Sequence, residues 1–480
     1  MTGSFEVEIE YLDASGDGIA HIPQRRVSVP FTIPGERVRV AISARHQSSS
    51  AVIPATLLDV LRPSPHRVRP ECRHFGAATA DGGGCGSCSW QHIAYPEQLR
   101  LKSALLKRLL DEALRQSPIV KPTHPGTPAQ PWGYRHKAHF VFGNEARAGR
   151  RPGRLLMGHY ARGSRRVVPV LECPVHDQRG NDIAFRFRDA FVRADVMAAA
   201  AGPEAGSGVL RSLAVRTAYG TSETLSTLVV ADDGDKRLRA ATRRVLTGGH
   251  LAGGVHLNIH SRGDAFIFGR QTRCLSGPTR LREQLAGTSF LISPTTFFQT
   301  NVYAAEVLVG LVLDAIPPGG EVLDLYAGAG LFAIPLARRG HRLVAVEENR
   351  GAVADGEASA RMNRIASAQC RFVARPVESA IGGFHRADHV IVDPPREGCA
   401  DGVIQDILGR LAPHRLIYVS CNPEALARDL QLASAFPYAI RTVQPVDMFP
   451  HTAHVETVVT LVRDRNAMGP GSPRTSGRRR

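Results

Sequence analysis

The stretch DLYAGAGLFAIPLA, residues 324–337, connects a short apolar run to a helical pattern through a glycine-rich turn. Gly328 and Gly330 would let the backbone approach a bound ligand closely, because glycine has no side chain to obstruct it. A turn of this kind also suits nicotinamide-binding dehydrogenases, so alone it does not identify the ligand. The stretch therefore predicts a cofactor-binding strand, turn and helix.

Apolar runs alternate with helical patterns on both sides of this turn. Between residues 321 and 462 the runs are EVLDLYAG, RLVAVEEN, HVIVDPP, RLIYVSCNP and HVETVVTLV. Runs of this kind with helical crossovers predict a mostly parallel, doubly wound sheet. Such sheets bind ligands at the carboxyl ends of their strands, so the chemistry is expected in the residues just after each run.

Acidic residues at the ends of these runs narrow the choice of cofactor. Glu347 ends the second run, where a carboxylate can accept hydrogen bonds from both hydroxyls of a ribose. Asp324 and the Asp-Pro-Pro that begins at Asp393 distinguish between the candidates. The combination resembles the class I methyltransferase fold, a Rossmann-like α/β domain, which implies S-adenosylmethionine as cofactor. A nicotinamide-dependent dehydrogenase is the alternative.

The stretch RLIYVSCNPEALARDL, residues 415–430, places Cys421 at the carboxyl end of an apolar run, directly before a helix that begins near Pro423. A thiol there would point into the ligand crevice, and the amides at the start of the helix would lower its pKa. Free cysteines are often no more than buried apolar residues. The position beside the cofactor turn favours a catalytic nucleophile.

A thiolate has a specific use in methylating a pyrimidine. Carbon 5 of uracil is a poor nucleophile, but addition of sulfur to carbon 6 makes an enolate whose carbon 5 attacks a sulfonium methyl group. A general base must then remove the proton from carbon 5 before the thiol is eliminated. Residues 451–462, HTAHVETVVTLV, supply Glu456, which out of this context would suggest an exposed strand carboxylate.

Taken in order, these motifs resemble the uracil-5 RNA methyltransferase family over nearly the whole chain, most closely the iron–sulfur members with a TRAM domain that act on 23S ribosomal RNA. The resemblance implies that Cys421 is the nucleophile and Glu456 the general base. It also implies a set of adenosylmethionine-binding residues: Gln299 in SPTTFFQTN, Tyr326, Gly328, Glu347 and Asp393. A transfer-RNA uridine methyltransferase is the nearest rival, and a non-catalytic RNA-binding protein is the competing class.

Short runs between residues 5 and 60 alternate apolar and polar positions and are separated by Gly, Pro and polar turns. This pattern predicts a small OB-like β-barrel. The segment resembles the TRAM domain, an RNA-binding module. Basic residues favour RNA contact over a barrel without a ligand: Arg25, Arg26, Arg37, Arg39 and Arg45.

The eight cysteines are too few for a disulfide scaffold in a chain of 480 residues. Cys72, Cys85 and Cys88 cluster, and Cys173 follows far along the chain. Four thiolates can hold a 4Fe–4S cluster or a tetrahedral zinc ion, and the family resemblance favours iron–sulfur, although the segment 77–84 lengthens the usual first spacing. The remaining three, Cys274, Cys370 and Cys399, are expected to be structural.

Four segments are expected: a TRAM barrel (1–62), an α+β central domain with the cysteines and an RNA-binding surface (63–290), the methyltransferase domain (291–464) and a disordered basic tail (465–480). In the central domain, the segments 133–140 and 153–170 combine basic residues with aromatic ones, as expected where phosphates are neutralised and bases stack.

The formal charge of +16 fits a polyanionic partner, although an arginine-rich composition alone could produce it. RNA is the expected partner, ribosomal first and transfer RNA second, with no obligate protein partner. Because no apolar run is long enough to span a bilayer and the N-terminus lacks a secretory pattern, a cytoplasmic location is expected.

Overall fold

The computed structural model describes residues 4–23, 25–42, 52–77, 84–127, 130–145, 153–199, 208–248, 253–262 and 266–464. The chain divides into two compact units. The first comprises Met1–Leu101, Gly126–Ala305 and Phe449–Ala453, and the second comprises the rest. The expected basic tail, Arg45 and most of the lengthened loop between Cys72 and Cys85 lie outside the described residues.

The first unit begins with a six-stranded sheet in the order β1-β5-β6-β4-β3-β2. Alternate residues of the strands face inward, as in β5, where Val38 and Val40 are fully buried and the residues between them are not. The strands are β1 (Ser4–Glu8), β2 (Tyr11–Leu12), β3 (Gly18–Ile22), β4 (Arg25–Val29), β5 (Arg37–Ile42) and β6 (Val52–Arg62). The expected strand-rich N-terminal domain is therefore present.

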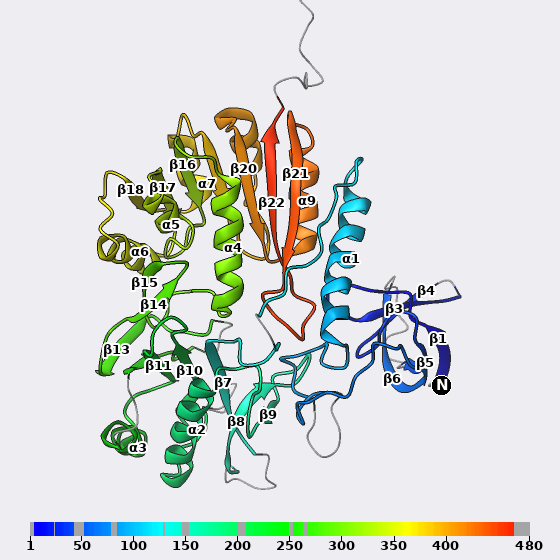
Figure 1. Ribbon diagram of the computed structural model, residues 1–480. Helices are drawn as coiled ribbons and strands as arrows, with labels where there is room; N and C mark the ends of the chain where they lie inside the picture. The colour runs from blue at the N-terminus through cyan, green and yellow to red at the C-terminus, as the bar shows by residue number, and fades with distance from the viewer. Residues whose placement is uncertain are drawn as a thin grey trace, which may run out of the picture. The chain divides into compact units, whose positions relative to one another are not determined.

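A seven-stranded sheet in the order β13-β12-β11-β10-β7-β8-β9 forms the larger part of the first unit. Its strands are β7 (Lys137–Asn144), β8 (Leu155–Tyr160), β9 (Val167–Pro169), β10 (Leu210–Thr217), β11 (Thr224–Val230), β12 (Gly253–Ile259) and β13 (Gln271–Ser276). Figure 1 shows the two helices that accompany it side by side, α2 (Gln178–Arg193) and α3 (Lys236–Thr247). A separate hairpin follows, β14 (Leu281–Leu285) and β15 (Thr288–Ile292).

The second unit is built on a seven-stranded sheet in the order β18-β17-β16-β19-β20-β22-β21. The first five are parallel, and β22 runs antiparallel to both of its neighbours. Figure 1 shows β20, β22 and β21 beside one another at one edge. The strands are β16 (Glu321–Leu325), β17 (Arg342–Glu347), β18 (Cys370–Ala374), β19 (His389–Val392), β20 (Arg415–Ser420), β21 (Tyr438–Val446) and β22 (Glu456–Arg463). The predicted doubly wound α/β domain is confirmed.

Helices link these strands and bury an apolar core against the sheet. They are α4 (Val302–Ala315), α5 (Ala333–Arg338), α6 (Arg350–Met362), α7 (Val377–Ala380), α8 (Val403–Gln405) and α9 (Pro423–Ala433), with a 3₁₀ turn at Ile381–Gly383 and a π-helical turn at Asp406–Leu411. Helix α1 (Tyr95–Ala113) contributes Leu106 and Leu110 to this core. The strands that follow β16 in the sequence lie on both sides of it, β17 on one side and β19 on the other. Ligands of open α/β sheets bind at the carboxyl ends of the strands at such a point.

Candidate active site

The glycine-rich turn leaves the carboxyl end of β16 with three residues at positive φ: Tyr326 at 61°, Gly328 at 55° and Gly330 at 84°. A Cβ added at Gly330 would lie 2.8 Å from the ring of Phe372, so packing as well as backbone conformation requires glycine there. A Cβ at Gly328 would meet nothing within 4 Å. The turn thus presents an open backbone surface at Gly328, as a nucleotide-type ligand requires.

Glu347 is held in place at the end of the neighbouring strand. Its Oε2 accepts a hydrogen bond from the Gly328 amide at 3.0 Å, and its Oε1 accepts one from the Asn349 amide at 2.7 Å. The hydroxyl oxygen of Tyr326 accepts a hydrogen bond from the Ala400 amide at 3.2 Å. Of the positions expected to bind the cofactor, Gly328 and Glu347 are therefore joined directly, and the Tyr326 side chain is held by the loop at Ala400.

Carboxyl groups crowd this edge of the sheet. Asp324 is fully buried, and burial raises its pKa well above the ordinary value, with Asp393 and Glu347 adding to the effect. Burial, with the charge of Glu347, raises the pKa of Asp393 to about 7. Each carboxylate makes it harder for the next to ionise, so the site favours protons or a cation.

Cys421 and Glu456 come from adjacent strands. The antiparallel register of β20 and β22 pairs Ser420 with Thr457, so the next residues along, Cys421 and Glu456, lie beside each other at the carboxyl end of β20. Glu456 is only 4% exposed, which contrasts with an ordinary surface carboxylate, and Cys421 is half-buried. One register step thus brings together the two residues that sequence reasoning assigned to catalysis.

Both groups are held in their protonated forms in the protein alone. Burial, with the charge of Asp393, raises the pKa of Glu456 to about 8. Burial, with the charges of Glu456 and Asp393, raises the pKa of the Cys421 thiol to about 12. The sequence predicted a lowered thiol pKa from the start of α9, and that direction is wrong for the protein alone because desolvation and carboxylates outweigh the helix amides.

The start of α9 fixes the backbone at Cys421. The side chain of Asn422 caps the helix by accepting a hydrogen bond from the Glu424 amide at 3.0 Å, and its Nδ2 donates to the Arg396 carbonyl oxygen at 2.8 Å. Pro423 occupies the first helical turn. Cys421 therefore sits on a rigid strand-to-helix corner.

Arg396 is a site residue that the sequence reasoning missed. It is exposed and follows the Asp-Pro-Pro after β19. Its positive charge partly opposes the rise in the pKa of both Cys421 and Glu456. The loop that carries it is anchored at Asp429, whose Oδ2 accepts hydrogen bonds from the Tyr418 hydroxyl at 2.6 Å and from the Cys399 amide at 2.9 Å. Its position in the loop that follows the carboxyl end of β19 was the signal that could have found it.

Gln299 belongs to the first unit, where it is buried after β15. The other four expected cofactor residues belong to the second unit. The role of Gln299 in binding adenosylmethionine stays a prediction.

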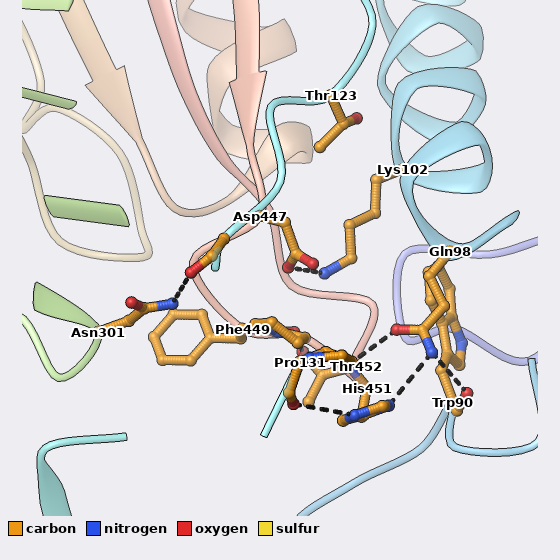
Figure 2. A network of polar contacts seen from close by, with 12 residues as sticks. Trp90, Gln98, Lys102, Thr123, Pro131, Asn301, Asp447, Phe449, His451 and Thr452 are labelled. Atoms are coloured by element: carbon orange, nitrogen blue, oxygen red, sulfur yellow. Dashed lines mark hydrogen bonds and ion pairs between the residues drawn. The ribbon is translucent and has the colours of Figure 1, made fainter. Parts of the chain in front are cut away.

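The motif around the expected base is divided between the units after Ala453. In the first unit, Figure 2 shows the ring of His451 hydrogen-bonded to Gln98 through Nδ1 at 3.2 Å and to the Pro131 carbonyl oxygen through Nε2 at 3.1 Å. The ring also stacks on Trp132 with centroids 4.0 Å apart. His451 has a positive φ of 65° and is buried, so this part of the motif holds the backbone.

In the second unit, the segment before this motif is fixed by a fully buried ion pair. The Nζ of Lys102 lies 2.5 Å from the Oδ1 of Asp447, and both side chains are 0% exposed (Figure 2). Asp447 follows β21, nine residues before Glu456. The pair ties α1 to the strand end that leads toward the expected base.

The four clustered cysteines line a single cavity in the first unit, together with residues that include His74, His159 and Glu172. Burial raises the pKa of Cys173, and the thiols of Cys88, Cys85 and Cys72 raise it further in that order. Four thiols around one cavity are a donor set of the kind that holds an iron–sulfur cluster or a tetrahedral zinc ion. Of the three cysteines expected to be structural, Cys370 and Cys399 are buried and Cys274 is exposed.

Comparison with known proteins places this fold and site in a family. Residues 289–464 match the family model tRNA (Uracil-5-)-methyltransferase, and residues 5–66 match that of the TRAM domain of tRNA (uracil(54)-C(5))-methyltransferase. A relative from Gloeobacter violaceus, named as an uncharacterized RNA methyltransferase, is 37% identical over 465 residues, covering 95% of this chain and 96% of its own. One from Thermosynechococcus vestitus with the same designation is 36% identical, covering 95% and 98%.

Among solved structures, the Pyrococcus abyssi tRNA (uracil-54, C5)-methyltransferase in complex with S-adenosyl-L-homocysteine superposes with a TM-score of 0.73 at 26% identity, covering 96% of this chain and all of its own. The fold and these matches define a class I, S-adenosylmethionine-dependent methyltransferase. More specifically, the chain belongs to the RNA (uracil-5-)-methyltransferase family with an N-terminal TRAM domain. Among the described residues, no helix combines the length and the apolar character that crossing a membrane requires.

Proposed function

We propose that this enzyme methylates carbon 5 of a uridine in RNA through a covalent bond between Cys421 and carbon 6 of the base, and that Glu456 is the general base. The single observation that carries the proposal is the juxtaposition of Cys421 and Glu456 by the register of β20 and β22. Both lie at the carboxyl ends of the parallel strands, where the cofactor turn also begins. A thiol and a buried carboxyl group side by side suit addition followed by proton removal.

The reaction needs each of these residues at a different step. The Cys421 thiol gives up its proton to solvent water as sulfur bonds to carbon 6, and carbon 5 then takes the methyl group that S-adenosylmethionine supplies when bound. The carboxylate of Glu456 accepts the proton from carbon 5, and the carbon–sulfur bond breaks to release the thiolate and restore the ring. Arg396 favours the anionic forms of both residues during this sequence.

For the cofactor, we propose Gln299, Tyr326, Gly328, Glu347 and Asp393 as binding residues. The fixed carboxylate of Glu347 is suited to accept hydrogen bonds from ribose hydroxyls. Stacked bases hide carbon 6 in a duplex, so the target uridine must be unpaired or flipped out. We also propose the division into domains at residues 62 and 290.

Ribosomal RNA, specifically 23S rRNA, is the substrate that we propose first, on the combination of the TRAM domain with the four-cysteine set. Transfer RNA is the second candidate. The solved Pyrococcus enzyme, named for uracil 54 of tRNA, matches 96% of this chain, so the architecture alone does not exclude a tRNA substrate. The exposed basic residues of the first sheet remain proposed RNA contacts, and two of them, Arg37 and Arg39, also pair with Glu6.

We further propose that Cys72, Cys85, Cys88 and Cys173 hold a 4Fe–4S cluster, with zinc as the alternative occupant. The thiols share one cavity and influence one another's pKa, which supports a common ligand. Methyl transfer does not need the redox chemistry of such a cluster, so its role here is to order the segments that carry the cysteines.

The decisive experiment incubates the enzyme with bulk unmodified RNA and methyl-labelled adenosylmethionine, followed by nucleoside analysis and mapping. We expect 5-methyluridine in 23S rRNA, and none with Cys421→Ala, whose adenosylmethionine affinity should be nearly unchanged. The same label in tRNA would favour the second candidate. Label on another atom, or turnover by Cys421→Ala, would overturn the covalent route.

A further inference from the structure

Two buried histidine rings lie next to Cys173 in the first unit. His159 is the second-last residue of β8, and His176 lies two residues before α2. The centroids of the two rings lie 5.3 Å apart, and both rings pack on the ring of Phe140. His159 is 8% exposed and His176 is 4% exposed. Neither residue has a part in methyl transfer as proposed above.

Each of these rings has a buried nitrogen without a hydrogen-bond partner among the described residues. These atoms are Nε2 of His159 and Nδ1 of His176. A buried polar atom without a partner carries a desolvation cost that a bound ligand would relieve. Because these two nitrogens lie beside Cys173, they are available together to a ligand from outside the polypeptide.

The ring of His159 offers a nitrogen to a metal ion. Its Nε2 is buried without a partner among the described residues. A neutral imidazole whose other nitrogen carries the proton binds a metal ion through the lone pair of such a free nitrogen.

The distances suit a single small ion. One ligand atom each from His159, Cys173 and His176 lies within 4.8 Å of the other two. Ligands of a tetrahedral zinc ion are about 3.3–3.7 Å apart, so side-chain shifts of about 1 Å would complete the site. Two imidazoles and one thiolate are a donor set that favours zinc or cobalt over calcium or magnesium.

We propose that His159, Cys173 and His176 form a second metal site, which binds one zinc-type divalent ion whenever Cys173 is not a ligand of the iron–sulfur cluster. Cys173 is shared, so the two occupants exclude each other. The site keeps Cys173 and the strand end at His159 fixed in chains that lack a cluster. The proposal is independent of the methylation chemistry.

The test uses the full chain carrying Cys72→Ser, Cys85→Ser and Cys88→Ser, which removes three cluster thiols and leaves the second set intact. Titration with cobalt(II) should saturate at one ion per chain, with tetrahedral visible bands and a sulfur-to-cobalt charge-transfer band. Zinc should displace the cobalt and remove these bands. Adding His159→Phe or His176→Phe should weaken binding at least tenfold, since each removes a ligand.

The matched control is His256→Phe in the same background. His256 is also buried and has two unpaired ring nitrogens, but within the described residues it belongs to no group of possible metal ligands. It should bind cobalt as the parent does. The chain carrying Cys72→Ala, Cys85→Ala and Cys88→Ala repeats the measurement with a different set of substitutions. The absence of charge-transfer absorption in both preparations would overturn the proposal, as would bands that survive His159→Phe and His176→Phe. Either failure leaves methylation by the cluster-containing enzyme untouched.

Discussion

The pKa of Glu456 makes a quantitative prediction about proton removal from carbon 5. With a pKa of about 8, about one Glu456 in eleven is ionised at pH 7 and about ten in eleven at pH 9. Only the ionised form can accept the proton, so the rate of this step should rise about tenfold between these pH values. The assay is single-turnover release of tritium from RNA labelled at carbon 5 of uridine.

Replacement of Glu456 by Gln should reduce tritium release by roughly 10²- to 10⁴-fold, the usual contribution of a general base. The methylated adduct should then accumulate and be visible as a protein–RNA band on denaturing gels. Glu321→Gln is the matched control, because Glu321 is exposed at the opposite end of β16. Equal release at pH 7 and pH 9 by the wild type, or release by Glu456→Gln near the wild-type rate, would refute the assignment.

The raised pKa of Glu456 also makes the free energy of unfolding depend on pH. The folded protein holds the Glu456 proton more tightly than the unfolded chain, so stability is lost as the pH rises from the ordinary value of 4.5 through about 8. The full shift corresponds to about 5 kcal/mol as an upper limit. Glu456→Gln should therefore raise the melting temperature at pH 9 and have little effect near pH 4.5, which a thermal melt at both values measures.

Three further predictions concern other parts of the chain. Glu347→Gln should weaken adenosylmethionine binding by about 10- to 100-fold in calorimetry, because it removes a charged acceptor worth about 1.5–3 kcal/mol, and unchanged affinity would exclude the ribose contact. Lys102→Met should destabilise the protein by about 3–5 kcal/mol, because it leaves Asp447 buried and unpaired. The double variant with Asp447→Leu should recover much of this loss. Equal melting temperatures for the single and double variants would contradict this prediction. Protein prepared without oxygen should contain iron and absorb broadly in the visible, and Cys88→Ser should remove both signals; an iron-free wild type would rule out the cluster.

The mostly parallel, doubly wound sheet could be predicted from the sequence because the signal is local. Parallel strands buried on both faces are continuous apolar runs, and the residues directly after them necessarily share one edge of the sheet. The assignment of Cys421 depended on that rule, whereas the assignment of Glu456 depended on the motif around it. Their direct adjacency follows from the antiparallel register of β22 with β20, which the motif's position made plausible and only the structure shows.

Properties that depend on several segments at once could not be predicted. The direction of the Cys421 pKa shift depends on how much water is excluded and on carboxylates that come from β19 and β22. The contacts of His451 join positions more than 300 residues apart in the chain. The group at His159 and His176 depends on β8 and the segment before α2 meeting beside Cys173, and no spacing rule in the sequence indicates it.

The crowding of carboxyl groups at the cofactor edge has a consequence for the direction of the reaction. Asp393 raises the pKa of both Asp324 and Glu456, and Glu347 raises that of Asp393, so these groups act as one electrostatic unit. A site of this kind favours a positively charged sulfonium over the neutral thioether that remains after transfer. The carboxylates that make the thiol hard to ionise in the free protein thus favour the methyl donor over the spent cofactor.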